Sequence, residues 1–588
     1  MGSNGDLNAN SEPFGSTGDP MVDKAVSQWM AWDKNPRTLA QMQTLVAEGR
    51  VVELRRRLCF RMTFGTAGLR AAMGAGFSRI NDLTVIQSTQ GMYKYLAKYF
   101  PDLKTRGLVV GFDTRAQASS GCTSERLARL TAAVMLCKDV PVYLFSSYVP
   151  TPFVPYAVIK YGAAAGVMVT ASHNRKEDNG YKVYWHNGAQ ISSPHDKEIL
   201  RCIGESAEPW PESWNEDLVE NSILRRDPLE EVCQSYMEEL NSLCFHRELN
   251  SRSPLRFVHS SFHGVGHSYV QRAFLQFGFP PPIPVPEQRD PDPEFSTVSC
   301  PNPEEGEPVL ELSLRLAERE KACVVLATDP DADRLAVAEQ NTCGWKVFTG
   351  NELAALLGWW TLFNWKEAHS DPADTERVYM LATTVSSKIL QAFARIEGFH
   401  FEVRFLCGDM VLDKDGVSTA AVVAEMAAYL QTKNLSLSQQ LCNIYQIYGY
   451  HISRTSYVIC NDPPTIDRIF SRLRSFGGPG QYPTSCGEYC ITQTRDVTTG
   501  YDSSQPDKKC VLPVTKNSQM VTFTFQNGIV ATLRTSGTEP KIKFYTEFCA
   551  PPGERDISSL EEELRKVSVA LVEEFLEPDK NNLIRRTI

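Results

Sequence analysis

Short apolar runs alternate with segments of helical periodicity from residue 108 onward, and this alternation restricts the fold more than any other feature of the sequence. The runs at 108–112, 140–145 and 166–169 are separated by helix-like segments at 124–137 and 154–162. A chain that alternates strand and helix in this way forms a parallel sheet covered by helices. The sequence therefore predicts an α/β unit in this region.

The same alternation returns twice, over residues 256–340 and 350–430. After residue 450 the texture changes to short strands and turns, with paired strands predicted around Asn527 and Gly528, a typical hairpin turn. At 588 residues the chain is too long for one hydrophobic core. We therefore predict an α/β fold of three successive α/β domains, followed by a smaller α+β domain.

The changes of texture also predict the domain boundaries. Residues 1–20 contain neither the basic start nor the apolar stretch of a signal peptide, and we expect a disordered tail there. The three α/β domains are predicted at 21–215, 216–343 and 344–455, and the α+β domain at 456–588.

Composition argues against several function classes. No apolar run approaches the roughly 20 residues that cross a bilayer, so we expect no membrane segment. The net charge of −10 argues against a sequence-independent grip on nucleic acid or on anionic membranes. The 16 cysteines form no C-x-x-C pair and no zinc spacing, which indicates reduced thiols in a cytoplasmic protein of the cytosol.

One serine stands where open α/β sheets bind ligands. Ser172 follows the apolar run 166–169, so it lies just beyond the carboxyl end of a predicted strand. A serine hydroxyl is a poor nucleophile unless a base accepts its proton or it already carries the group to be transferred. The G-x-S-x-G pattern of hydrolases is absent. Taken alone, the loop is equally consistent with a helix cap or a turn.

Three aspartates follow another apolar run at alternate positions. Asp329, Asp331 and Asp333 come directly after residues 322–327. Carboxylates so close together repel one another unless a cation joins them, and a set of oxygen ligands suits magnesium. The spacing imitates an EF-hand, but Arg334 stands where that loop requires glycine. The alternative interpretation is an acidic turn exposed to solvent.

Near the C-terminus the chain combines cations with hydroxyls. Arg534 is followed by Ser536, Gly537 and Thr538 and then by Lys543. A turn of this composition presents backbone N–H groups, hydroxyls and a guanidinium to a phosphate. The alternative is an ordinary loop between two strands.

Two earlier segments also carry arginines. Arg70 follows a glycine-rich turn, and Asp113 and Arg115 form an acid–base pair that is also consistent with a surface contact. Together the motifs suit phosphoryl transfer, which depends on in-line positioning and charge neutralisation more than on covalent machinery. A phosphorylated Ser172 would carry about −1.5 to −2 charges and would offer an oxygen to the metal.

The motifs, in this order and over nearly the whole chain, resemble those of the α-D-phosphohexomutase superfamily. They are "TFGTAGLR" at 63–70, "TASHN" at 170–174, "DPDADR" at 329–334 and "RTSGTEPK" at 534–541. The resemblance implies four domains around a central cleft and Mg2+ as the cofactor. It also implies that Ser172 is the phosphorylated nucleophile.

The same resemblance implies roles for the other residues. Asp329, Asp331 and Asp333 would hold the metal together with the phosphorylated Ser172. His173 and Lys182 both stand as candidates for the general base. The residues implied to bind the substrate and its phosphate are Arg70, Arg334, Lys414, Arg534, Ser536, Gly537, Thr538 and Lys543.

Within the superfamily, segments such as "NGYKVYWHNGAQI" at 179–191 and "TTGYDSSQPDKK" at 498–509 resemble the phosphoglucomutase-2 branch. That branch includes a mutase of hexose and pentose phosphates and a sister enzyme that makes glucose 1,6-bisphosphate. Arg175, where most members have proline, favours the sister. The implied reaction moves a phosphoryl group from 1,3-bisphosphoglycerate to Ser172 and then to a glucose monophosphate. Residual phosphoglucomutase activity is expected, and phosphoglucomutase or phosphopentomutase activity is the alternative.

One departure from the family pattern affects the third predicted domain. Between residues 402 and 413 the family carries a Gly-Phe-Lys-Trp-type loop and a Glu-Glu-Ser/Ala-Ile-Gly loop that holds sugar hydroxyls, and this chain has only "VRFLCGDMVL". The absent part corresponds to the ~30 residues of a βαβ unit. Losing a strand and a helix leaves backbone groups unpaired and apolar faces uncovered. We therefore expect a truncated third domain and weak or absent activity on glucose phosphates.

Two alternatives stay open at the level of sequence. Residues 324–333 resemble the strand-and-aspartate motif of haloacid-dehalogenase-type phosphotransferases, in which Asp329 would be the nucleophile. Hydroxylamine separates this alternative, because it cleaves an aspartyl phosphate and not a phosphoserine. A chain with a damaged third domain is otherwise a catalytically impaired isoform. Melting that glucose 1,6-bisphosphate shifts upward would favour a working site, because a ligand that binds only the native state stabilises it.

Overall fold

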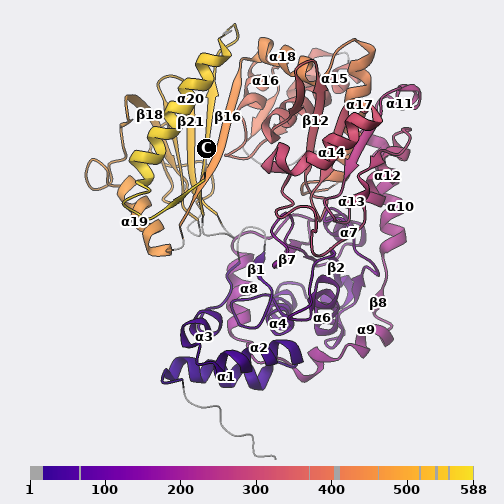
Figure 1. Cartoon of the computed structure of the whole chain (residues 1–588), viewed down its shortest axis with the longest axis vertical. Helices are drawn as coiled ribbons and strands as arrows, with labels where there is room; N and C mark the ends of the chain where they lie inside the picture. The colour runs from indigo at the N-terminus through magenta and orange to yellow at the C-terminus, as the bar shows by residue number, and fades with distance from the viewer. Residues whose placement is uncertain are drawn as a thin grey trace, which may run out of the picture.

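The structure is a computed structural model of the chain. It describes residues 17–64, 68–369, 371–402, 411–460, 462–514, 518–536, 541–553 and 556–586. Four main sheets divide the chain into successive units (Figure 1). In Figure 1 the first unit, drawn indigo to purple, lies at the bottom, and the C-terminal unit, drawn orange to yellow, lies at the upper left.

Three helices precede the first sheet. They are α1 (Pro20–Trp32), α2 (Pro36–Ala47) and α3 (Val51–Leu58). The Asp19 side chain accepts hydrogen bonds from the first turn of α1, as a helix cap does. The predicted tail lies outside the described residues up to residue 16, and the rest of it leads into α1.

The first unit contains a six-stranded sheet in the order β1-β7-β6-β2-β5-β8. Its strands are β1 (Leu69–Ala72), β2 (Leu108–Phe112), β5 (Val142–Leu144), β6 (Ala165–Val169), β7 (Asp178–Trp185) and β8 (Arg225–Arg226). Strands β2 and β6 are parallel and buried at every residue, because helices cover both faces of the sheet. Helices α4 (Asp82–Tyr99) and α6 (Ser124–Leu136) pack on one face, and α7 (Phe153–Tyr161) packs on the other.

The second unit repeats this plan with five strands in the order β10-β9-β11-β12-β13. They are β9 (Phe257–Ser260), β10 (Ile283–Pro284), β11 (Val324–Thr328), β12 (Leu335–Asn341) and β13 (Gly344–Val347). Helices α12 (Gly266–Gln276) and α14 (Glu307–Glu320) cover opposite faces. The metal-binding motif predicted from sequence is the connection between β11 and β12, which run antiparallel.

The third unit has much less sheet than the first two. Over residues 371–402 and 411–460 its only strands before β16 are β14 (Tyr379–Leu381) and β15 (His400–Glu402), which pair with each other. The helices are α15 (Gly350–Ala368), α16 (Ile389–Glu397), α17 (Gly416–Thr432) and α18 (Leu437–Tyr448). They share one hydrophobic core with α7, α12 and α10 (Leu229–Glu239). The described residues thus form only a two-stranded sheet in the unit for which we predict the loss of a strand and a helix.

The fourth unit is an antiparallel sheet covered by helices α19 (Pro463–Leu473) and α20 (Ile557–Leu571). Its main strands are β16 (His451–Ile459), β18 (Tyr489–Asp496), β20 (Met520–Phe525), β21 (Ile529–Thr535) and β22 (Lys541–Cys549). Strands β20 and β21 pair antiparallel around Gly528, which has a φ of +90°. The predicted hairpin is therefore confirmed.

Two sheet memberships differ from the predicted domain boundaries. Strand β8 pairs with β5, so the first sheet continues beyond residue 215. Strand β16 begins at His451, before the predicted start of the fourth domain. In the part of the chain that the structure describes, no helix is both long and apolar enough to cross a membrane.

Candidate active site

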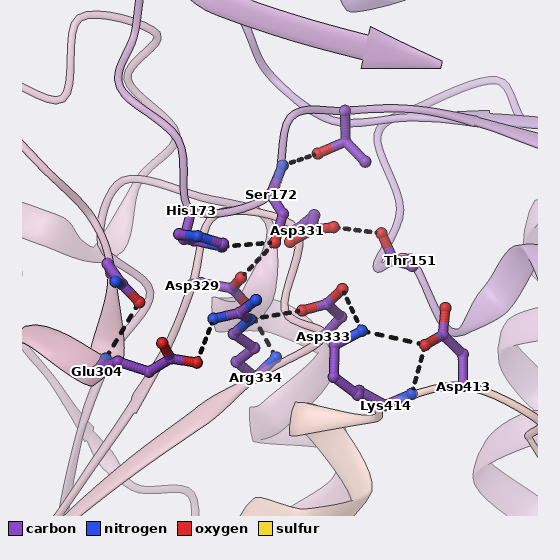
Figure 2. A network of polar contacts seen from close by, with 12 residues as sticks. Thr151, Ser172, His173, Glu304, Asp329, Asp331, Asp333, Arg334, Asp413 and Lys414 are labelled. Atoms are coloured by element: carbon purple, nitrogen blue, oxygen red, sulfur yellow. Dashed lines mark hydrogen bonds and ion pairs between the residues drawn. The ribbon is translucent and has the colours of Figure 1, made fainter. Parts of the chain in front are cut away.

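Ser172 lies in the loop that follows β6 and is buried (Figure 2). Its φ is +56°, a left-handed conformation that is uncommon outside glycine and strained for serine. The backbone N–H of Ser172 donates to Thr170 Oγ1 at 2.8 Å. The local fold thus holds one serine in an unusual conformation at the carboxyl end of the sheet.

The three predicted metal ligands lie together in the loop after β11. Asp329, Asp331 and Asp333 are all buried, and one carboxylate oxygen of each lies within 4.8 Å of the others. The interpretation as an acidic turn exposed to solvent is therefore wrong. Ala332, between two of them, has a φ of +53°, which helps the loop to turn its carboxylates inward.

The serine loop and the metal loop meet directly. The Ser172 hydroxyl donates to Asp329 Oδ2 at 2.9 Å, although the two residues are 157 positions apart. His173 Nδ1 lies 3.4 Å from the same hydroxyl oxygen. Figure 2 shows both contacts around the Ser172 side chain. A hydroxyl, an imidazole and a carboxylate cluster therefore share one point.

Cations from three parts of the chain balance the carboxylates. Lys182, on β7, is buried and donates to Asp331 Oδ2 at 2.7 Å and to Asp333 Oδ2 at 2.8 Å. Lys414 Nζ lies 3.3 Å from Asp333 Oδ2. Arg334 Nε lies 3.7 Å from Asp333 Oδ1, and the backbone N–H of Arg334 donates to Asp329 Oδ1 at 2.9 Å. Every carboxylate of the triad therefore has a donor from protein.

The electrostatics of the cluster follow from burial and charge. Burial, and then the charges of the other two aspartates, raise the pKa of Asp329 well above its usual value. Burial alone would also raise the pKa of Asp333, but the neighbouring cations, Lys182 first, hold it well below the usual range. Burial, and after it the charges of Arg334 and Arg70, lower the pKa of His173 well below its usual value. His173 is therefore a neutral imidazole at neutral pH.

The triad fits a hard divalent cation. Asp331 Oδ1 and Asp333 Oδ1 are buried and have no hydrogen-bond partner. Buried carboxylate oxygens without a donor are costly unless a cation or water satisfies them. Carboxylate oxygens are the ligands that magnesium and calcium prefer. The three described aspartates thus include carboxylate oxygens that are available to bind a cation.

Two residues at the site were missed by sequence reasoning. Thr151 donates from Oγ1 to Asp331 Oδ2 at 2.5 Å, and its N–H donates to the Asp331 carbonyl. Asp413 accepts from Lys414 Nζ at 3.1 Å and from the Tyr184 hydroxyl at 2.6 Å. Thr151 follows β5, beyond the carboxyl end of a parallel strand. Ligands bind at such positions in α/β sheets, so the sequence could have indicated Thr151 as a site residue.

Of the two early arginines, Arg115 is buried and Arg70 is half-buried. Arg70, on β1, donates to Asn174 Oδ1 at 3.5 Å, and burial lowers its pKa. Arg115 and Asp113 form an ion pair at 3.2 Å with both side chains excluded from solvent. The interpretation of Asp113 and Arg115 as a surface pair is therefore wrong.

The predicted phosphate-binding residues lie partly outside the described residues. Gly537 and Thr538 are among the undescribed ones. Arg534 on β21 faces Lys543 on β22 in the sheet register, and its guanidinium donates to the Tyr545 hydroxyl at 2.8 Å. The Ser536 N–H donates to the Lys541 carbonyl at 2.9 Å. The charge of Lys543 contributes to the lowered pKa of His173, which relates this part of the fourth unit electrostatically to the serine loop.

Two family models match the chain. The model for the phosphoglucomutase/phosphomannomutase α/β/α domain I matches residues 61–209, and the model for α/β/α domain II matches residues 234–344. The first match contains Ser172, and the second contains the aspartate triad.

Curated relatives match over nearly their full length. The Homo sapiens glucose 1,6-bisphosphate synthase is 65% identical over 618 aligned positions, which cover 99% of each chain. The Homo sapiens phosphopentomutase is 54% identical and covers 96% of this chain and 97% of its own. The first alignment is longer than the 588 residues of this chain, so at least 30 of its positions face gaps here. That number agrees in size with the predicted loss in the third domain.

Solved structures of low sequence identity share the fold. A putative phosphomannomutase from Thermus thermophilus matches with a TM-score of 0.60 at 19% identity, over 87% of this chain and 99% of its own. Parafusin, a phosphoglucomutase from Paramecium, matches with a TM-score of 0.59 at 17% identity, over 87% and 96%. With the relatives of high identity, these matches establish that the chain belongs to the phosphoglucomutase/phosphomannomutase family of the α-D-phosphohexomutase superfamily.

Proposed function

We propose that this chain transfers a phosphoryl group to a glucose monophosphate and so makes glucose 1,6-bisphosphate, with Ser172 as the carrier. The observation that carries the proposal is the 2.9 Å contact between the Ser172 hydroxyl and Asp329 inside the buried triad. The synthase relative at 65% identity supports this product over the pentose phosphate mutase named by the relative at 54%. Residual phosphoglucomutase activity follows if the same serine can return its phosphate.

We propose Mg2+ as the metal, held by Asp329, Asp331 and Asp333 and by an oxygen of the phosphorylated Ser172. Asp331 Oδ1 and Asp333 Oδ1, which accept no hydrogen bond, support this ligand set. When bound, the ion neutralises the charge of the phosphoryl oxygens during transfer. Lys182 keeps the carboxylates oriented through its two short hydrogen bonds.

In the first half-reaction the Ser172 oxygen forms a bond to phosphorus, and the bond from phosphorus to the donor oxygen breaks. The donor that we propose is 1,3-bisphosphoglycerate, by resemblance to the family branch. Its leaving group is a carboxylate, which is stable without protonation, so the donor side needs no general acid. The serine proton needs an acceptor. We propose His173 Nδ1, 3.4 Å from the hydroxyl oxygen, because Asp329 Oδ2, to which the hydroxyl donates here at 2.9 Å, would be a ligand of the metal. Lys182 is less suited, because its ammonium already donates to two carboxylates.

In the second half-reaction a hydroxyl oxygen of the glucose monophosphate forms a bond to phosphorus, the bond from phosphorus to the Ser172 oxygen breaks, and the proton of the sugar hydroxyl passes to the Ser172 oxygen. Its existing phosphate must be held away from the reacting end, and we assign that task to Arg534, Ser536, Gly537, Thr538 and Lys543. The cations at the reacting end would be Arg70, Arg334 and Lys414. The paired positions of Arg534 and Lys543 on neighbouring strands support one cationic clamp.

The third unit limits this second step. The chain has no Glu-Glu-Ser/Ala-Ile-Gly segment to hold the sugar hydroxyls, and its described sheet has only two strands. We therefore propose that the serine accepts a phosphoryl group while its transfer to sugar is slow, which makes this chain an impaired form of the enzyme. The site of action that we propose is the cytosol, where thiols such as those of the described cysteines stay reduced.

The test is intact-mass and peptide mass spectrometry after incubating the purified chain with Mg2+ and 1,3-bisphosphoglycerate. We expect a phosphate on the peptide that contains Ser172 and none on a Ser172→Ala variant. The phosphate should survive hydroxylamine, because the alternative aspartyl phosphate would not. A protein that melts cooperatively and gains no phosphate would refute the proposal.

A further inference from the structure

The Arg115 guanidinium lies inside the loop that carries Ser172. Its Nη2 donates to the carbonyls of Ser172 at 2.5 Å and of Asn174 at 2.7 Å. Its Nη1 donates to the carbonyls of Arg175 at 2.8 Å and of Asp178 at 2.9 Å. One side chain thus binds four carbonyls between residues 172 and 178, and the loop is wrapped around it.

The guanidinium is fixed from its other sides as well. Its Nε lies 3.2 Å from Asp113 Oδ2, and Asp113 in turn accepts from the Ser124 hydroxyl at the start of α6. The Phe295 ring, from the second unit, lies 5.1 Å from the guanidinium carbon. Arg115 is 1% exposed, so its charge is balanced by Asp113 and by carbonyl dipoles, with little contribution from water.

The other contacts of the loop are scattered, and none of them joins as many of its residues as Arg115 does. Its backbone hydrogen bonds to itself are those from Asn174 N–H to the Ala171 carbonyl and from Asp178 N–H to the Arg175 carbonyl. Outside the loop, the Met73 N–H donates to the Glu177 carbonyl at 2.8 Å, and Lys176 Nζ donates to Glu294 at 2.7 Å. The side chains of Arg175, Lys176 and Glu177 are exposed. The left-handed conformation of Ser172 is strained, and strain of this kind persists only where surrounding contacts over-determine the backbone.

We propose that Arg115 is a positioning residue that holds the serine loop in the conformation in which the Ser172 hydroxyl meets Asp329. The inference rests on the proposed role of Ser172 as phosphoryl carrier. Arg115 itself stays behind the loop, and all its contacts to the loop are to backbone carbonyls. The planar fork of five N–H donors is what four carbonyls in different directions require, and a lysine ammonium has three donors on one atom.

The test compares Arg115→Lys with the unchanged chain by two readouts. At saturating 1,3-bisphosphoglycerate and Mg2+, we expect Ser172 to be phosphorylated about tenfold to a hundredfold more slowly, because small misplacements of reacting groups have effects of this size. In brief trypsin digests, we expect faster cleavage after Arg175 and Lys176, identified by the masses of the fragments. The second readout reports the loop without requiring any chemistry at Ser172.

Arg106→Lys is the matched control. Arg106 also donates to backbone carbonyls of the first unit, those of Gly162 and Ala163, but it lies away from the serine loop. The Arg106→Lys variant should leave the rate of Ser172 phosphorylation and the trypsin cleavage after Arg175 and Lys176 unchanged. A purely structural role of Arg115 would lower the melting temperature without accelerating cleavage at these two bonds below that temperature.

Several outcomes would overturn the inference. The inference is wrong if the Arg115→Lys variant melts cooperatively and is phosphorylated at the original rate. It is also wrong if phosphorylation is slower but trypsin cleavage is unchanged. If Arg115→Lys does not fold, Asp113→Asn decides, because it weakens the hold on the guanidinium with an isosteric change. Unchanged cleavage and rate in that variant would contradict the inference. If the unchanged chain gains no phosphate, the proposed function fails, while the cleavage comparison still tests the hold on the loop.

Discussion

The first and third units show how differently two α/β units of one chain can be equipped. The first has a six-stranded sheet whose central strands are buried at every residue; its loops supply Ser172 and Thr151, and its strand β7 supplies Lys182. The third has a two-stranded sheet whose strand β14 is only half-buried. Its helices α15 and α17 nevertheless bury many apolar side chains. In the function that we propose, the phosphoryl site and the sugar site are built by different units, and the missing segment would affect the sugar site.

The part of the third unit that reaches the phosphoryl site is held by the other units. Asp413 accepts from Tyr184 and Gln190 of the first unit, and Asp415 accepts from the Tyr236 hydroxyl. The Gly416 N–H donates to the Ala332 carbonyl of the metal loop. These contacts place Lys414 beside Asp333 without help from the strands β14 and β15. The comparison predicts that the phosphoryl chemistry survives where sugar recognition does not.

The largest expected effect is that of Ser172→Ala. It removes the oxygen that would carry the phosphoryl group, so phosphorylation of that peptide should vanish and formation of glucose 1,6-bisphosphate should fall by about a thousandfold or more. Ser235→Ala, at a half-buried serine on α10 outside the site, is the control. Substantial product from the Ser172→Ala variant would contradict the comparison, because phosphoryl transfer would then not depend on the first unit.

Restoring the missing segment should have the next largest effect. A chain with about 30 family-like residues inserted between Glu402 and Asp413 should transfer phosphate to glucose 1-phosphate about a hundredfold faster, because the sugar hydroxyls would then be oriented. The rate of Ser172 phosphorylation should hardly change. Initial rates of both half-reactions test this directly, and equal sugar-transfer rates in the two chains would contradict the proposed impairment.

Asp331→Asn should weaken the metal site without unfolding the unit. It removes one anionic ligand, and we expect magnesium affinity to fall by about tenfold to a hundredfold. Magnesium should raise the melting temperature of the unchanged chain, since a ligand that binds only the folded state stabilises it. The variant should need correspondingly more magnesium for the same shift. Glu304→Gln, which changes an exposed partner of Arg334, is the charge-matched control.

The smallest effect is a difference between two matched leucines. Leu144 and Leu381 each end a three-residue strand, in the first and third sheet, and Leu144 is 2% exposed while Leu381 is half-buried. Leu144→Ala should lower the free energy of unfolding of its unit by about 2–5 kcal/mol. Leu381→Ala should lower that of its unit by about 1 kcal/mol, because less apolar area is removed from a packed environment.

Urea unfolding, read by hydrogen exchange of peptides from each sheet, measures the two leucine variants separately. Similar losses in the two units would mean that the third sheet is as well packed as the first. The contrast between the units would then lie only in the missing sugar segment.

The sequence by itself determined the elements and the local motifs. The apolar runs became β2, β6 and β11, because parallel strands buried on both faces need continuous apolar residues. Ser172 and the three aspartates could be found from the residues alone, because each motif is short and directly follows a strand. The resemblance supplied the order of these motifs along the chain.

Only the tertiary structure decided which residues support these motifs. Arg115 acts through four carbonyls at least 57 positions away, and carbonyls leave no trace in a sequence pattern. Thr151 and Asp413 reach their partners across 180 and 229 positions. Distances of this kind are set by how the units pack, and packing depends on the whole chain at once, whereas a strand or a turn depends on its neighbours.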